Sequence, residues 1–154
     1  AVIAHALGVI RRDIFKQPCD PNECAAVALY HDSSEILTGD LPTPIKYYNP
    51  EIKEAYKQVE RIAGNRLLDR LPSQLRESYE HYVLEDEEDL LPFVKGADKL
   101  SAHIKCLEEQ KAGNTEFDTA AKQTWEAMKQ MARPELDWFL ENCLEAFMLN
   151  LDQL

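Results

Sequence analysis

Apolar residues recur at intervals of three and four positions along almost the entire chain of 154 residues. Near the start, one helix face is expected to be buried, because its apolar residues have the spacing i, i+4, i+7: Ile3, Leu7, Ile10 and Ile14. No run alternates apolar and polar residues in the way that predicts a strand, and no internal repeat is present. We therefore expect an all-α fold, a single compact bundle of about six or seven helices.

Capping residues mark where these helices begin. Asp20 and Pro21 fit the N-cap and the first position of a second helix. Asn49 and Pro50 fit the same two positions of a third helix. The last helix is expected to begin at Pro134. Its apolar residues are expected to be buried, namely Leu136, Phe139, Leu140, Cys143 and Phe147.

The composition limits the possible partners. The chain carries 28 Asp and Glu against 17 Lys and Arg, a formal net charge of -11. Because nucleic acid binding draws on clustered Lys and Arg, we expect no nucleic acid polymer as a partner. No apolar run approaches the roughly 20 residues needed to cross a bilayer, so we expect no membrane span. The four cysteines form no C-x-x-C pair and are too few for a secreted disulfide framework, which favours a cytoplasmic location.

A cluster of metal-ligating residue types follows the second helix. If that helix continues, Glu35 is four residues beyond His31 and three beyond Asp32, so the three side chains project to one side. An imidazole beside two carboxylates suits a divalent cation that takes mixed nitrogen and oxygen ligands. A helix-end cap with a surface glutamate is an equally good interpretation of these residues alone.

Asp98 is the second candidate. Its helical neighbours include Leu91, Val94 and Ala102, so we expect the carboxylate to border the buried stripe of a long helix. An ionised carboxylate there needs a cation or several hydrogen-bond donors. The alternative is a structural salt bridge, for which the available bases are Lys95, Lys99 and Arg66.

Together these elements resemble the HD-domain metal-dependent phosphohydrolases, in which a His, a His-Asp pair and a distant Asp lie on helices. Two runs are similar to the bacterial 5'-deoxynucleotidases of the YfbR type: HDSSEILTGDLPTP at His31–Pro44 and VKGAD at Val94–Asp98. KCLEE at Lys105–Glu109 and AGN at Ala112–Asn114 are similar to them as well. The resemblance extends over nearly the whole chain.

The resemblance implies a phosphatase that hydrolyses deoxyribonucleoside 5'-monophosphates to deoxyribonucleoside and phosphate. It implies that one divalent transition-metal cation, such as cobalt or manganese, is bound by His31, Asp32 and Asp98. It also implies a homodimer and a part for Glu35 in catalysis. The substrate site is expected to include Asp32, Asp40, Leu41, Pro42, Thr43 and Asp98.

Elementary chemistry assigns roles to some of these residues. Phosphate monoesters hydrolyse very slowly without a catalyst, so an enzyme has to position a nucleophile and neutralise charge, and one metal ion can do both. Asp32 is expected to orient the attacking water, and Glu35 to donate a proton to the departing 5' oxygen. Asp40 lies in a loop stiffened by Pro42, where it is expected to accept a hydrogen bond from a sugar hydroxyl and help exclude ribose. A plain turn role is the alternative for Asp40.

We interpret residues 1–154 as one HD domain without its N-terminal arm and without the first metal-binding His, which by alignment falls before Ala1. His5 corresponds to a position that is not a ligand. Two other functions stay open: another HD phosphohydrolase that acts on a nucleoside triphosphate or an alarmone, and a non-catalytic helical HD module. A substrate with more phosphates needs more bases, whereas the lysines near the candidate site are isolated: Lys95, Lys99 and Lys105.

Overall fold

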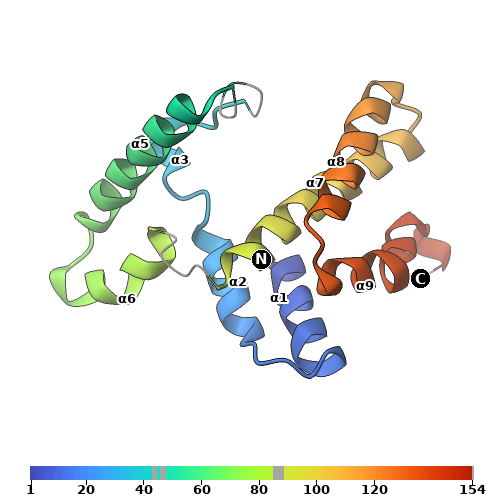
Figure 1. The fold of residues 1–154 in the computed structure, drawn as a ribbon, viewed down its shortest axis with the longest axis horizontal. Helices are drawn as coiled ribbons and strands as arrows, with labels where there is room; N and C mark the ends of the chain where they lie inside the picture. Colours follow the sequence, from blue (N-terminus) through green and yellow to red (C-terminus); the bar gives the residue numbers. More distant parts are fainter. Residues whose placement is uncertain (43–44, 46–47, 85–88, 154) are drawn as a thin grey trace. The chain divides into compact units, whose positions relative to one another are not determined.

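The computed structural model describes residues 1–42, 45, 48–84 and 89–153. These residues form helices and connecting segments, and no strand occurs among them, which confirms the all-α prediction (Figure 1). The chain divides into two compact units. We call Ala1–Ala25 together with Leu90–Leu154 the terminal unit, and Ala26–Asp89 the central unit. That both form a single domain stays a prediction.

The terminal unit is built around the longest helix. This helix, α7 (Leu91–Lys111), packs against α1 (Val2–Val9) and α8 (Asp118–Gln130), and α9 (Pro134–Asn142) packs against α1. A π-helical turn, η1 (Ile10–Ile14), continues α1. Three 3-10 segments complete the unit: η2 (Thr115–Phe117), η3 (Leu144–Met148) and η4 (Leu151–Gln153).

The core of the terminal unit follows the helical periodicity of the sequence. Leu100 on α7, Met128 on α8 and Leu136 on α9 are each at most 1% exposed. Each such leucine or methionine contributes roughly 1.5–3 kcal/mol by leaving water. Gly8 allows α1 to approach the start of the next helix, α2 (Pro21–Tyr30), because a Cβ at this position would lie 2.9 Å from the Cα of Pro21.

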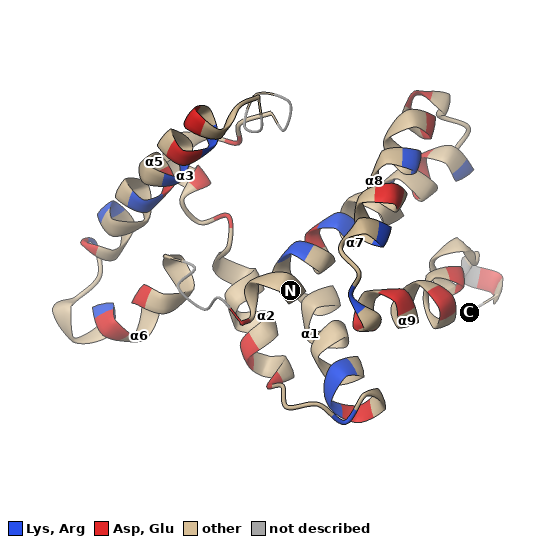
Figure 2. Cartoon of the chain, viewed as in Figure 1, with Lys and Arg blue, Asp and Glu red and all other residues tan. Residues whose placement is uncertain are grey.

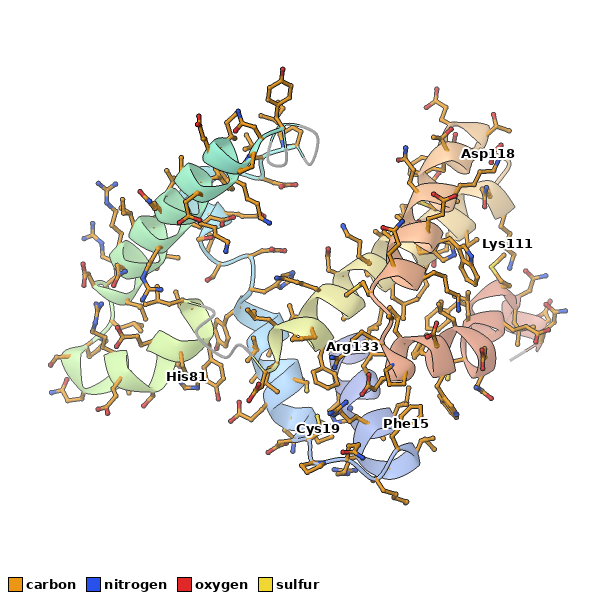
Figure 3. All side chains as sticks on the ribbon, in the orientation of Figure 1. Phe15, Cys19, His81, Lys111, Asp118 and Arg133 are labelled. Atoms are coloured by element: carbon orange, nitrogen blue, oxygen red, sulfur yellow. The ribbon has the colours of Figure 1, made fainter. Side chains whose placement is uncertain are left out.

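An ion-pair cluster is buried at the edge of this core. The Glu135 side chain is 2% exposed and accepts a hydrogen bond of 2.5 Å from Arg11, while Arg133 lies 3.6 Å away on its other oxygen. Both guanidinium groups lie over the ring of Phe93, at 6.0 and 5.4 Å from its centroid. Arg133 is labelled in Figure 3. Because an unpaired carboxylate would be costly here, these two arginines allow Glu135 to be buried.

The last helix is shorter than the sequence predicts. Leu136, Phe139 and Leu140 are buried as expected, but α9 ends at Asn142 and the chain continues as η3. Cys143 at this break is only partly buried, and Phe147 is 43% exposed. The predicted burial of these two residues is wrong, because the change to 3-10 geometry rotates later residues off the buried face.

Helix α2 (Pro21–Tyr30) begins in the terminal unit and ends in the central unit. Asp20 caps it as predicted, since its Oδ1 accepts from the Asn22 amide at 2.9 Å. The four cysteines are free thiols. Cys24 on α2 is fully buried, its Sγ lies 3.6 Å from that of Cys19, and burial is the main cause that raises the pKa of its thiol to about 12.

Further helices in the described part of the central unit are α3 (Glu35–Thr38), α5 (Pro50–Leu68) and α6 (Ser73–Val83). Helix α5 packs against both of the others. Asn49 caps α5 as predicted, because its side chain accepts from the Ile52 amide at 2.7 Å. Acidic and basic residues are interspersed along α5, as Figure 2 shows. None of the helices in the described residues combines the length and apolar character that a membrane crossing needs.

Candidate metal and nucleotide site

His31 lies directly after the last residue of α2. Its Nδ1 is 3.0 Å from the carbonyl oxygen of Ala28, one turn back, so this nitrogen carries the proton and donates it to the backbone. A hydrogen bond of this kind fixes the orientation of the ring and is common in metal-ligating histidines. The other ring nitrogen, Nε2, lies on the opposite side of the ring from Nδ1 and is 3.0 Å from Oδ2 of Asp32.

This contact between His31 and Asp32 has two chemical interpretations. An imidazole protonated on both nitrogens would donate to the Ala28 carbonyl oxygen and to Oδ2 of Asp32. A neutral imidazole would direct the lone pair of Nε2 toward a region that it shares with the carboxylate of Asp32, and two such donor atoms 3.0 Å apart suit adjacent ligands of one cation. Both side chains are accessible, at 29% and 59% of their surface. The donor set therefore fits the predicted transition metal.

The helix does not continue through Glu35, contrary to the sequence expectation. Helix α2 ends at Tyr30, and the Ser33 backbone amide donates to the Tyr30 carbonyl at 2.9 Å in a turn. Glu35 is instead the first residue of the short helix α3. Residues 31–34 form turns in place of a further helical turn, and the Glu35 amide donates to the Asp32 carbonyl at 3.0 Å. Glu35 and His31 therefore do not share one helix face by regular helical spacing.

The segment after α3 holds the predicted sugar-recognition residues. Gly39 ends the helix with a φ of 69° and a ψ of 166°, a conformation that is essentially restricted to glycine. Asp40 and Pro42 are exposed, and Leu41 is partly buried. The predicted contact residue Thr43 lies outside the described residues, as does Pro44.

Asp98 lies on α7 in the terminal unit. Its side chain is 55% exposed and its carboxylate is 3.8 Å from the ammonium of Lys99, one of the predicted partners. Its neighbours Val94 and Ala97 are buried, which agrees with a position at the border of the stripe. The carboxylate itself is exposed together with Ser101 and Ala102, so the expected need for a cation or several donors is wrong. An exposed carboxylate with one distant base has little need for structural compensation, which leaves Asp98 free to take a ligand role.

The structure brings His31 and Asp32 into contact and places Glu35 and Asp40 in the same unit, whereas Asp98 belongs to the other unit. Within residues 1–42, 45, 48–84 and 89–153, no three or more His, Cys, Asp or Glu side chains are grouped to hold a metal ion. The joint ligand set of His31, Asp32 and Asp98 stays a prediction.

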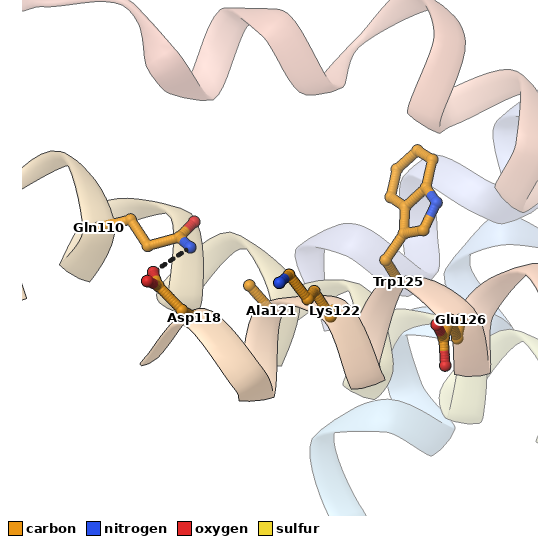
Figure 4. Close-up of a pocket in the computed structure, with 6 residues that line it drawn as sticks. All are labelled: Gln110, Asp118, Ala121, Lys122, Trp125 and Glu126. Carbon is orange, nitrogen blue, oxygen red and sulfur yellow. Dashed lines mark hydrogen bonds between the residues drawn. The ribbon is translucent and has the colours of Figure 1, made fainter. Parts of the chain in front are cut away.

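A pocket of about 480 Å³ lies on the terminal unit, away from these residues in the sequence. It is lined by Gln110, Asp118, Ala121, Lys122, Trp125 and Glu126 (Figure 4). Gln110 donates to Asp118 at 2.7 Å across its floor. None of the predicted site residues lines it, and the sequence pattern offered no signal for it beyond the spacing of Trp125.

Comparison with known proteins decides the family. Residues 1–147 match the family model described as YfbR-like 5'-deoxynucleotidase. The chain belongs to this family. The whole chain is 43% identical to the 5'-deoxynucleotidase of Shewanella oneidensis, of which it covers 80%, and 44% identical to that of Erwinia tasmaniensis, of which it covers 79%. Identity to the 5'-deoxynucleotidase of Vibrio cholerae is 43%, with 80% of that protein covered.

Family membership confirms two expectations drawn from the sequence. The HD-type resemblance is correct, and the enzyme class is 5'-deoxynucleotidase. The family implies a metal-dependent hydrolase, in agreement with the donor types found at His31 and Asp32. A non-catalytic helical module is thereby disfavoured.

Proposed function

We propose that this protein hydrolyses deoxyribonucleoside 5'-monophosphates to deoxyribonucleoside and phosphate, with one divalent transition-metal cation held by His31, Asp32 and Asp98. The observation that carries the proposal is the His31–Asp32 pair. Its imidazole is oriented by the Ala28 carbonyl, and its Nε2 lies 3.0 Å from a carboxylate oxygen. Membership of the 5'-deoxynucleotidase family supplies the reaction class.

The roles of the protein residues follow from charge and proton balance. When bound, a divalent cation polarises the phosphoryl group and makes a nearby water more acidic. Asp32 orients the attacking water by accepting one of its hydrogen bonds. Glu35 supplies the proton that the departing 5' oxygen needs when the bond from phosphorus to that oxygen breaks. The water oxygen ends on phosphate, the proton that the water loses is released to phosphate or solvent, and the deoxyribonucleoside leaves as an alcohol. Glu35 takes a proton back from solvent before the next turnover.

Substrate selection is assigned to the loop after α3. The Asp40 carboxylate is exposed and follows a glycine whose backbone conformation turns the chain sharply. It accepts a hydrogen bond from a sugar hydroxyl, while Leu41 and Pro42 line the nucleotide site. A buried hydroxyl without a partner is costly, so a wall close to C2' rejects ribose by leaving its extra hydroxyl crowded and unsatisfied.

The decisive experiment measures phosphate release from dAMP and AMP after chelation and after manganese or cobalt is added back. We expect activity to be lost on chelation, restored by the metal, and greater on dAMP. His31→Ala should lower metal content and turnover together, whereas the matched control His81→Ala, an imidazole on α6 of the same unit, should keep both. Metal-independent hydrolysis, or full activity in His31→Ala, contradicts the proposal.

The same assay separates the remaining roles. Glu35→Gln should slow dAMP hydrolysis by about 100-fold while sparing p-nitrophenyl phosphate, whose leaving group needs no proton. Equal turnover of both substrates in wild type and Glu35→Gln would rule out the acid role. Asp40→Ala should reduce the preference for dAMP over AMP. Faster release from a triphosphate or an alarmone than from dAMP would favour the alternative substrate class.

The oligomeric state belongs to the proposal as well. We expect a homodimer, and light scattering of the purified protein at several concentrations checks it. A monomer at every concentration would remove this part of the proposal and leave the reaction unaffected.

A further inference from the structure

The peptide group of Gly39 joins the helix that begins at Glu35 to Asp40, and both carboxylates belong to the proposed site. Gly39 is the C-cap of α3, whose first residue is Glu35, and it directly precedes Asp40. Its amide donates to the carbonyl of Glu35 at 2.9 Å. The conformation of Gly39 therefore determines where α3 ends. It also determines in which direction the chain continues into residues 40–42, which we call the Asp40 segment.

The carbonyl of this peptide is held by two hydroxyl groups. Tyr56 on α5 donates to the Gly39 oxygen at 2.9 Å, and Thr38 donates to it at 3.0 Å. A carbonyl oxygen has two lone pairs, so both bonds can be satisfied together. The Tyr56 oxygen is also 3.5 Å from the Thr38 hydroxyl. Thr38 is the adjacent residue, whereas Tyr56 reaches the peptide from 17 residues further along the chain.

The hydrogen bond from Tyr56 restricts a backbone that side-chain packing does not hold. Gly39 has a φ of 69° and no side chain that restricts its backbone. A Cβ built at this residue would meet no atom within 4 Å. Steric packing therefore does not hold the peptide in place. Because glycine has the largest conformational freedom of any residue, a bond from a separate helix is an effective way to restrict it.

We infer that Tyr56 is a positioning residue for substrate recognition: its hydroxyl fixes the Gly39 peptide and so holds the Asp40 segment in the orientation that distinguishes the deoxyribose. This inference rests on the proposed function. Tyr56 acts through the backbone of Gly39, whose carbonyl accepts its hydrogen bond. Loss of its hydroxyl is expected to affect sugar recognition more than chemistry at phosphorus.

The test compares Tyr56→Phe with Tyr48→Phe, a control that removes the hydroxyl of a tyrosine that is 78% exposed. Tyr56→Phe should raise KM for dAMP by about 3- to 10-fold, the cost of one hydrogen bond, and lower the preference for dAMP over AMP. Its hydrolysis of p-nitrophenyl phosphate, which has no sugar, should be unchanged, as should its melting temperature within a few degrees. Tyr48→Phe should match the wild type throughout.

A second variant perturbs the same peptide from within. Gly39→Ala places a side chain at a φ that disfavours it, so it should show the same pattern of raised KM and reduced discrimination. An unchanged preference for dAMP in both variants overturns the inference while the proposed function stands. Equal losses on dAMP and p-nitrophenyl phosphate would show a purely structural role and overturn it too. A wild-type protein without activity on dAMP overturns the proposed function and this inference with it.

Discussion

The terminal unit and the central unit are stabilised in different ways. In the terminal unit, side chains from α7, α8 and α9 are almost completely removed from water, with Leu100, Met128 and Leu136 as examples. In the central unit fewer of the described residues are buried, with Leu68 on α5 as an example and none on α3 or α6. Hydrogen bonds from Asn49 and Tyr56 hold the start of α5 and the end of α3. Burial gives a rigid scaffold, whereas hydrogen bonds near helix ends leave polar side chains accessible for a ligand.

The position of the candidate site residues agrees with this difference. His31, Asp32, Glu35 and Asp40 follow one another around the two ends of α3, in the central unit. Asp98 is the exception, since it is carried by α7, the central helix of the packed core. The comparison therefore predicts that a change at Asp98 affects function without affecting stability, although its helix is the most buried one.

Asp98→Asn is the change from which we expect the largest effect. Replacement of the carboxylate by a neutral amide removes a predicted metal ligand, so metal-dependent turnover should fall by about 100-fold or more. Because the side chain is 55% exposed, the melting temperature should stay close to that of the wild type. Asp118→Asn, on α8 of the same unit, is the control and should retain activity. An active Asp98→Asn protein would exclude Asp98 from the ligand set.

Leu100→Ala tests the packing of the terminal unit. The side chain is 0% exposed, so its truncation should lower the free energy of unfolding by about 2–5 kcal/mol, measured by urea denaturation. Leu75→Ala on α6, where the leucine is 46% exposed, should cost well under half as much. Equal losses at the two positions would contradict the different burial of these two leucines on α7 and α6.

Asn49→Ala tests the hydrogen bonds of the central unit. The variant loses the acceptor for the Ile52 amide, which should cost about 1 kcal/mol and speed amide hydrogen exchange at the start of α5. Exchange of the α7 amides should be unaffected. Asn49→Asp keeps an acceptor at the same place and should behave like the wild type. Faster exchange in α7 as well would show that the two units do not respond independently.

The smallest expected effect concerns His103 on α7. Burial of the imidazole lowers its pKa below the usual 6.5, and its Nδ1 is 2.9 Å from the Thr124 hydroxyl. As the pH falls below about 6.5, the unfolded chain binds a proton that the folded chain does not, so stability decreases toward acid. Melting temperatures between pH 7.5 and 5 should show this decline, and His103→Gln should reduce its slope. The slope should persist in His81→Gln. A slope that is unchanged in His103→Gln would contradict the assignment.

The local sequence was sufficient for several features. Asp20, Asn49 and Pro134 begin helices as predicted, because capping and the fixed φ of proline act within a few residues. The apolar period indicated the all-α class, since it reports which face of each helix leaves water. The family was recognisable from runs of chemically constrained residues such as His31–Pro44, whose spacing a sequence displays directly.

Other features depended on contacts between distant residues, and only the tertiary structure decided them. Phe147 was expected to be buried but is exposed, because α9 ends early, and Asp98 is more accessible than its neighbours in the sequence suggested. The bond from Tyr56 to the Gly39 carbonyl could not be foreseen, since it joins two helices across 17 residues. Local propensity determines where a helix begins, whereas packing against other elements determines where it stops, which side chains remain in water and which peptide a hydroxyl can reach.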